Sequence, residues 1–154
     1  MVRIATIVTA VLFVTAAAAH DFNLGAINID HPWSRATPPG AKVAAGYMQV
    51  VNRSDAPVTL TGAAADFANV EFHSMAMENG VMQMGEVGSI TIGAGETLTF
   101  EPGGLHIMFT GLKAPLKAGE IRKATLDFGK DGKVTVAFVV EAMGTAHDHS
   151  AHAD

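Results

Sequence analysis

The heptapeptide GLHIMFT, in the second half of the chain, alternates between apolar side chains and side chains that can bind a metal. Leu105, Ile107 and Phe109 occupy every second position. His106 and Met108 stand between them. An alternation of period two predicts a β-strand whose apolar face enters a core. His106 and Met108 then share the opposite face, roughly 6–7 Å apart along the strand.

A second alternating segment, VEFHSMAMENGVMQM, predicts a β-hairpin. Its centre is Asn79-Gly80, a dipeptide typical of a two-residue turn between antiparallel strands. With that turn, Met75 lies directly opposite Met84, and directly opposite residues share a face of the sheet. We therefore expect His73 and Met84 to be diagonal neighbours on one face, roughly 7–8 Å apart at Cα.

These two segments supply two imidazoles and two thioethers, from His73, Met84, His106 and Met108. Imidazole suits copper, and the soft thioether sulfur favours Cu(I) over Zn²⁺, Mg²⁺ or Ca²⁺. We interpret the four side chains as one Cu(I) site. Met75 repeats the His-x-Met pattern after His73 and is the candidate auxiliary ligand.

The hairpin carries two further methionines, Met77 and Met82. We interpret them as neighbours that shield the metal from water, or as substitute ligands during transfer. Methionines more often fill cores, but the four motif side chains are expected to point away from the apolar faces of their strands.

The ligand spacing is a His, ten residues, a Met, twenty-one residues, and then His-x-Met. In this it resembles the motif of the PCu(A)C-type periplasmic copper chaperones. The flanking segments HPWSRATPPGAKVAAGYM and PGGLHIMFTGL are also similar, and the resemblance covers residues 26–142. It implies a cupredoxin-like Greek-key β-sandwich. It also implies a protein that carries copper to the subunit of cytochrome c oxidase with the dinuclear copper centre, or to a Sco-type thiol protein.

Short runs of Val, Ile, Thr and Phe, punctuated by Gly, Pro, Asn and Asp, predict an all-β fold with a single domain over residues 20–142. The expected strands are Gly25–Asp30, Val43–Asn52, Val58–Ala64, Asn69–Met77, Val81–Val87, Glu96–Glu101, Leu105–Thr110, Ala124–Phe128 and Lys133–Val140.

Both ends of the chain differ in composition from this domain. Residues 1–19 are typical of a cleaved secretory signal, so we expect a periplasmic protein without stable membrane insertion. Residues 143–154 predict a flexible tail. Three histidines make the tail a second candidate site, for Cu(II), although a solvated tail that binds nothing is an equal alternative. They are His147, His149 and His152.

Near the front, His31, Trp33 and Arg35 belong to the flanking segment that resembles the family. We expect Trp33 to pack over an edge of the sandwich and Arg35 to hold a loop by hydrogen bonds. His31 is interpreted as a surface or capping residue because it lies outside the ligand motif.

Charge and composition limit the function. The net charge of −5, without a basic patch, argues against nucleic acid or anionic lipid as partners. The absence of cysteine excludes a blue-copper site with a thiolate ligand. No constellation of acid, base and nucleophile is apparent, so the chain is not expected to be an enzyme. The alternatives are a copper-sequestering protein, a copper-dependent oxidase or Cu(II) site using His20 as the mature N-terminus, and a purely structural sandwich.

Overall fold

The strands follow the alternating patterns of the sequence. In the computed structural model, which describes residues 21–144, every second side chain along β2, β3, β11 and β12 is buried for most of the strand. The elements are β1 (Phe22–Leu24), β2 (Ile27–Arg35), β3 (Val43–Asn52), β4 (Val58–Leu60), β5 (Gly62–Ala65), β6 (Asn69–Glu78), β7 (Val81–Val87), β8 (Ile90–Ile92), β9 (Thr97–Phe100), β10 (His106–Thr110), β11 (Ile121–Asp127), the 3-10 turn η1 (Gly129–Asp131) and β12 (Lys133–Glu141). Within these residues no helix has the length and hydrophobicity needed to span a bilayer.

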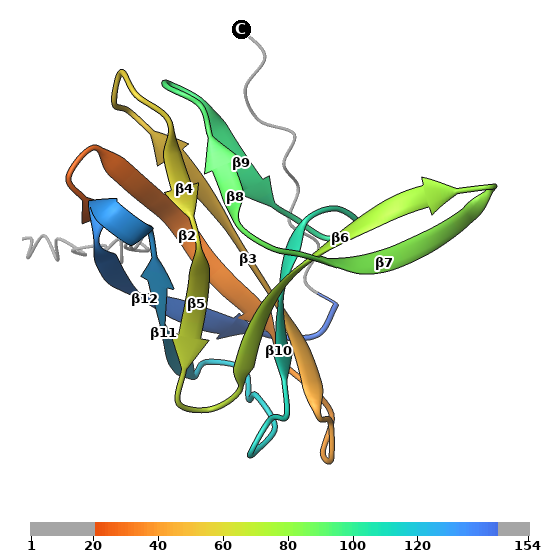
Figure 1. Cartoon of the computed structure of the whole chain (residues 1–154). Coiled ribbons are helices and arrows are strands. Elements are labelled where there is room, and N and C mark those ends of the chain that lie inside the picture. Colours follow the sequence, from red (N-terminus) through yellow and green to blue (C-terminus); the bar gives the residue numbers. More distant parts are fainter. Residues whose placement is uncertain (1–20, 145–154) are drawn as a thin grey trace, which may run out of the picture.

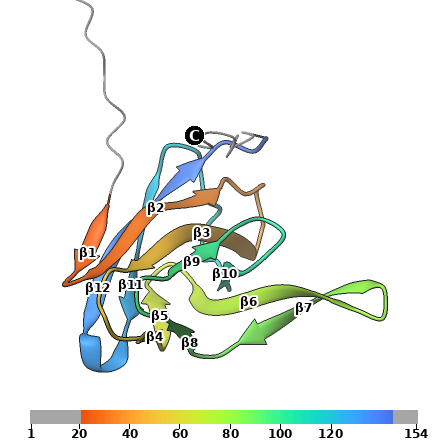
Figure 2. The ribbon, with the colours of Figure 1, turned by 90° about the horizontal axis from the view of Figure 1, so that it is seen from above.

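One large sheet carries most of these strands, in the order β5-β11-β12-β2-β3-β10-β6-β7. All of its neighbouring strands are antiparallel except β12 and β2, and β1 and β9 add to β2 and β3. The sheet bends around the core, so that β5 and β6 come into contact although they lie far apart in the strand order (Figures 1 and 2). The small pair β4–β8 lies outside this order. The expected all-β sandwich is confirmed.

The core is centred on aromatic rings from β10 and β12. Phe109 is fully buried, and its ring lies 5.5 Å from that of Phe138 and 5.0 Å from that of Phe67. A Cβ atom on Gly46 of β3 would come within 2.7 Å of the Phe109 ring. The close packing of β3 on this cluster therefore requires glycine at position 46.

Three expected strands differ by more than one residue from those observed, and one of them, Ala124–Phe128, is observed as Ile121–Asp127. Residues 58–64 form β4 and β5, in different sheets, because the chain turns at Thr61, whose backbone N–H donates to the carbonyl of Asp127 at 2.8 Å. The first expected strand continues to Arg35, with an irregularity between Asp30 and Trp33 where His31 has a φ of 48°. The short strands β1 and β8 were not expected.

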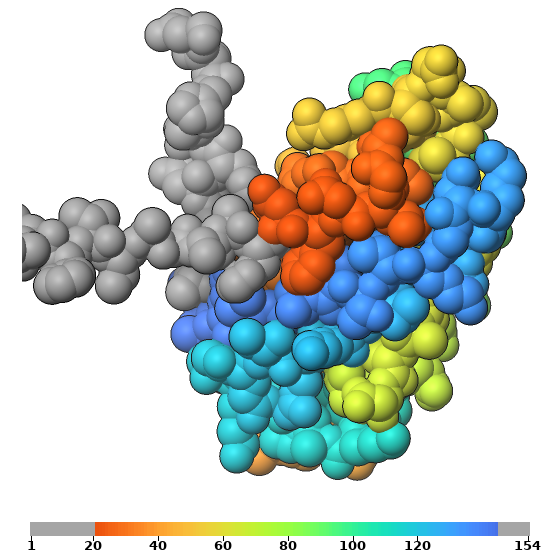
Figure 3. Space-filling model, turned by 90° about the vertical axis from the view of Figure 1, so that its left-hand side faces the viewer, coloured from red at the N-terminus to blue at the C-terminus, as the bar shows by residue number. Residues whose placement is uncertain are grey.

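The expected position of the tryptophan is also wrong. Trp33 lies on β2, between β12 and β3, and only 4% of it is exposed. Its ring contacts that of Tyr47 in a tilted arrangement with a centroid distance of 4.5 Å, and the guanidinium of Arg35 lies 5.7 Å from its centre. Arg35 thus makes a cation–π contact with a buried ring. Figure 3 shows the side of the molecule away from the β6–β7 hairpin, where β1 and β2 lie against β11 and β12.

The β6–β7 hairpin has the register expected from its turn. Glu78 is paired with Val81, and Met75 with Met84. Asn79 and Gly80 have φ values of 50° and 79°, as a type I′ turn requires. Beyond its pairing with β10, the hairpin projects from the body of the sandwich (Figures 1 and 2). The face that carries the methionines is therefore open to solvent near the turn.

Candidate metal centre

The candidate site lies on one face of three adjacent strands, β10, β6 and β7. β10 pairs with β6 so that His106 is directly opposite His73, and Met108 is opposite Glu71. Because directly paired residues share a face, His73, His106 and Met108 all lie on the face away from Phe109. The two histidines, thirty-three positions apart in sequence, are thus nearest neighbours across the sheet.

The two imidazole rings are spaced for one shared ion. Their centroids lie 6.0 Å apart, and the ring planes are inclined by 37°. With metal–nitrogen bonds of about 2.0–2.1 Å, an ion lies about 3.2 Å from each ring centre, so rings that share it are at most about 6.4 Å apart. His106 is 7% exposed, and the side chain of His73 is 15% exposed. An ion between them would therefore be largely sheltered from water.

Hydrogen bonds engage one nitrogen of each ring. His106 Nδ1 lies 3.0 Å from the carbonyl oxygen of Gly104, to which it can donate, and this leaves Nε2 available for a metal ion. His73 Nε2 lies 2.8 Å from a carboxylate oxygen of Glu71. His73 Nδ1 is buried and has no hydrogen-bond partner among the described residues. A buried nitrogen without a partner is costly, and a metal ion would satisfy it.

The methionines lie at different distances from the histidine pair. Met108 is half-buried and next to His106 on the same face of β10. Met75 is half-buried on β6 and two residues from His73. Met84 is 53% exposed on β7 and directly opposite Met75. Met84 is two strands away from β10, about 10 Å across the sheet, and it lies about 7 Å from the His73–His106 pair in the strand direction. It is therefore the most distant of the four motif residues from His106.

Met77 and Met82 lie closer to the turn than the histidine pair does. They face each other near the turn, and 66% of Met77 and 47% of Met82 are exposed. Met77 is four positions from His73 along β6, which corresponds to about 13 Å. The interpretation that these two side chains shield the metal, or act as substitute ligands during transfer, stays a prediction.

Other candidate ligands lie elsewhere. His31 is on the surface, with Nε2 3.7 Å from a carboxylate oxygen of Glu141, which agrees with its interpretation as a surface residue. The signal segment 1–19, His20 and the tail histidines lie outside the described residues 21–144. The tail histidines are His147, His149 and His152. Within residues 21–144 no three His, Cys, Asp or Glu side chains are grouped as a metal site, so the candidate donor set is one of imidazoles and thioethers.

Sequence reasoning did not assign a role to Glu71 or Tyr47. Glu71 stands two residues before His73, so the alternation already placed both on one face. Tyr47 is next to Gly46, the partner of Ile107, and it therefore lies beside His106 in the neighbouring strand. Burial raises the pKa of Tyr47, and the charge of Arg35 opposes this more weakly. The phenol stays protonated at neutral pH and is no anionic ligand.

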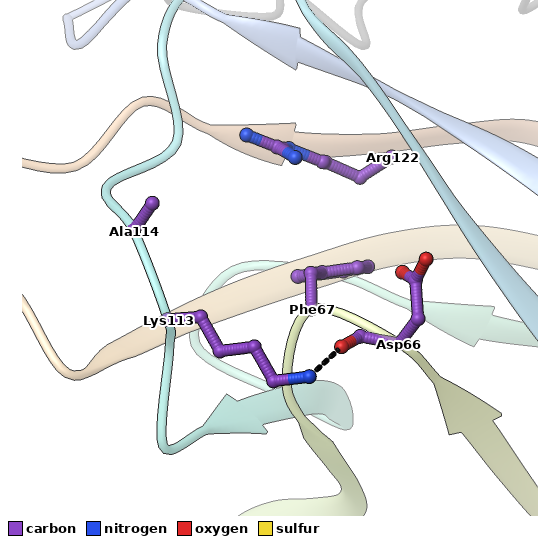
Figure 4. A pocket seen from close by; sticks show the side chains of 5 residues that line it. All are labelled: Asp66, Phe67, Lys113, Ala114 and Arg122. Atoms are coloured by element: carbon purple, nitrogen blue, oxygen red, sulfur yellow. Dashed lines mark hydrogen bonds between the residues drawn. The ribbon is translucent and has the colours of Figure 1, made fainter.

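A shallow pocket between the β5–β6 connection, the segment after β10, and β11 does not resemble a metal site. Phe67 lies between the side chains of Lys113 and Arg122, with Ala114 at one side (Figure 4). Lys113 Nζ donates to the carbonyl of Asp66 at 2.5 Å, and the guanidinium of Arg122 lies 5.9 Å from the Phe67 ring centre. Arg122 Nη2 also donates to a carboxylate oxygen of Glu120 at 2.7 Å.

Comparison with known proteins identifies the class. Residues 27–140 match the model of a family described as "Putative lipoprotein LpqE-like". A relative from Leifsonia xyli subsp. xyli, "Putative lipoprotein Lxx21020", is 33% identical over 125 residues, which are 80% of this chain and 74% of the relative. The chain belongs to the LpqE-like family.

Solved structures give the same fold. A copper-bound PCuAC domain from PmoF2 is 35% identical, with a TM-score of 0.68 over 80% of this chain and 98% of that domain. The Cu(I) form of DR1885 from Deinococcus radiodurans is 36% identical, with a TM-score of 0.57 over 81% of this chain and 83% of that protein. These matches confirm the resemblance to PCu(A)C-type domains.

Proposed function

We propose that this chain is a copper chaperone that binds Cu(I) through His73, Met84, His106 and Met108, with Met75 as an auxiliary ligand. The observation that carries the proposal is the pair of facing imidazoles, 6.0 Å apart, on a sheet face that also bears thioethers. Copper-bound relatives of the same fold support it. Soft sulfur ligands and neutral imidazoles favour Cu(I).

The same donor set suits a carrier. His73 and His106 are largely buried and would hold the ion, whereas Met84 is 53% exposed and can be exchanged for a ligand of the recipient. Cu(I) then moves without a change of oxidation state, as one sulfur–copper bond breaks and another forms. An exchangeable outer ligand favours delivery over sequestration.

Export and delivery complete the proposal. We infer that residues 1–19 direct the chain to the periplasm, that residues 20–142 carry the Cu(I) site, and that the tail residues 143–154 offer a weaker Cu(II) site. The recipient would be the oxidase subunit with the dinuclear copper centre or a Sco-type thiol protein. Deletion of residues 144–154 should reduce Cu(II) binding and leave Cu(I) binding intact, and unchanged Cu(II) binding would refute the tail site.

The Cu(I) site is tested by competition with a chromophoric Cu(I) chelator, using the full chain. His106→Ala should abolish competitive binding, and Met108→Ala and Met84→Ala should each weaken it. Met143→Ala is the matched control, because Met143 is 63% exposed and lies beyond β12, away from the hairpin. Unchanged Cu(I) affinity in both Met84→Ala and Met108→Ala would end the assignment of thioether ligands.

A further inference from the structure

The outer half of the β6–β7 hairpin carries four methionines in two facing pairs. Met75 is opposite Met84, and Met77 is opposite Met82. All four share the face of His73, since they occupy alternate positions on the paired strands. Among the other methionines of residues 21–144, Met48 is buried in the core, Met108 is on β10 beside His106, and Met143 lies beyond β12, so only the hairpin carries facing methionine pairs.

The hairpin geometry brings the thioethers within reach of one ion. In a two-residue hairpin the residues that flank the turn, Glu78 and Val81, form a hydrogen-bonded pair. The next pair along the strands, Met77 and Met82, is therefore a non-hydrogen-bonded pair, in which the Cα atoms are closer. The methionine pairs are therefore of the type with Cα atoms about 4.5 Å apart, and successive pairs are about 7 Å apart along the strands. Flexible thioether side chains on such a rectangle can converge on a metal above it.

Neither core packing nor the histidine site explains the outer pair. Met77 and Met82 are largely exposed, and no other strand of residues 21–144 covers this part of the hairpin (Figures 1 and 2). They lie about 13 Å along the strand from His73, further out than Met75 and Met84, and are not among the candidate ligands of the histidine site. Exposed large apolar side chains grouped on one face indicate a binding function.

We propose that Met75, Met77 and Met82 form a second soft-metal site, which receives Cu(I) near the turn and passes it to the histidine pair. Met75 lies between the two sites and contributes to either, and Met84 is the first ligand of the inner site that the ion meets. The transfer is a ligand exchange in which each new Cu–S or Cu–N bond replaces a Cu–S bond, with copper remaining Cu(I). This inference rests on the proposed function for the inner site.

The test uses Ag(I), a soft monovalent substitute for Cu(I) that does not change oxidation state. The full chain, labelled at the methionine methyl groups, is titrated and followed by NMR. Two equivalents should bind to the wild type, the second shifting the methyl signals of Met77 and Met82. The double variant Met77→Leu/Met82→Leu should lose one equivalent and keep the other. Met143→Leu is the matched control, and the signal of the buried Met48 should not move.

The outcomes separate the two proposals. If Met77→Leu/Met82→Leu still binds two equivalents, the second site is refuted. If the wild type binds one equivalent that His106→Ala removes, the second site falls and the proposed function stands. If the wild type binds one equivalent that the double variant loses and His106→Ala retains, the inner site falls instead. Both leucine substitutions are at exposed positions, so the variant should fold like the wild type.

Discussion

The contact between Glu71 and His73 predicts whether Glu71→Gln weakens or strengthens Cu(I) binding. The carboxylate lies 2.8 Å from His73 Nε2, and Nδ1 of the same ring is buried without a partner. If copper binds Nδ1, the carboxylate orients the ring and makes its nitrogen a better donor, as in other carboxylate–histidine–metal arrangements. Glu71→Gln should then weaken Cu(I) binding, because it keeps an acceptor of similar shape but removes the charge.

The size of the effect follows from the hydrogen bond. A hydrogen bond to a charged group contributes about 1.5–3 kcal/mol, and a charge-assisted bond is about twice as strong as a neutral one. Losing the assistance therefore costs about 0.7–1.5 kcal/mol, which is about three- to tenfold in the dissociation constant. The side chain of Glu71 is 36% exposed, so solvent screening favours the lower end of this range.

The measurement is competition between the full chain and a chromophoric Cu(I) chelator at fixed ionic strength. Glu86→Gln is the matched control. Glu86 is exposed and lies opposite His73 on β7, so this substitution also removes one negative charge from a residue beside His73. It should change the affinity by less than about twofold. Tighter binding in Glu71→Gln would refute the reasoning, since Glu71 would then compete with copper for Nε2.

Three further predictions concern the fold that supports the site. Phe109→Ala should lower the free energy of unfolding by about 3–5 kcal/mol in urea titrations, because the ring is fully buried in the aromatic cluster. Gly80→Ala should speed amide hydrogen exchange in β6 and β7, since a left-handed residue with a side chain costs about 1–2 kcal/mol at a φ of 79°. The pKa of Asp127 is lowered below its ordinary 3.8, mainly by a hydrogen bond from the Gly129 N–H and then by a hydrogen bond from Lys133. The ionised carboxylate therefore stabilises the fold above about pH 4. In thermal melts, the difference in melting temperature between the wild type and Asp127→Asn should shrink as the pH falls below about 4.

Local alternation was sufficient to predict the elements that bear the candidate metal ligands. The alternation around His106 predicted β10, and Asn79-Gly80 predicted both the hairpin and its register, which pairs Met75 with Met84. These features depend on contacts between residues close in the chain. A two-residue turn fixes its own pairing, so no knowledge of distant strands was needed.

The remaining features depend on pairings between distant segments. The sequence did not show that β6 lies beside β10 with His73 opposite His106, although the family resemblance implied that they meet. It also did not show the separation of β4 from β5, because both continue one apolar alternation and only the partner strands distinguish them. Trp33 was expected at an edge for the same reason, since its position depends on the parallel pairing of β12 with β2.

The turn belongs to the candidate metal centre although it contributes no ligand. His73 and Met84 are eleven positions apart, an odd separation that would place them on opposite faces of a single continuous strand. They share a face because the Asn79-Gly80 turn pairs Glu78 with Val81. A slip of one residue between β6 and β7 would move Met82 and Met84 together to the other face. The φ values of Asn79 and Gly80 therefore determine which thioethers share the face of His73, and the motif's ten intervening residues, an even number, fit the register of this turn.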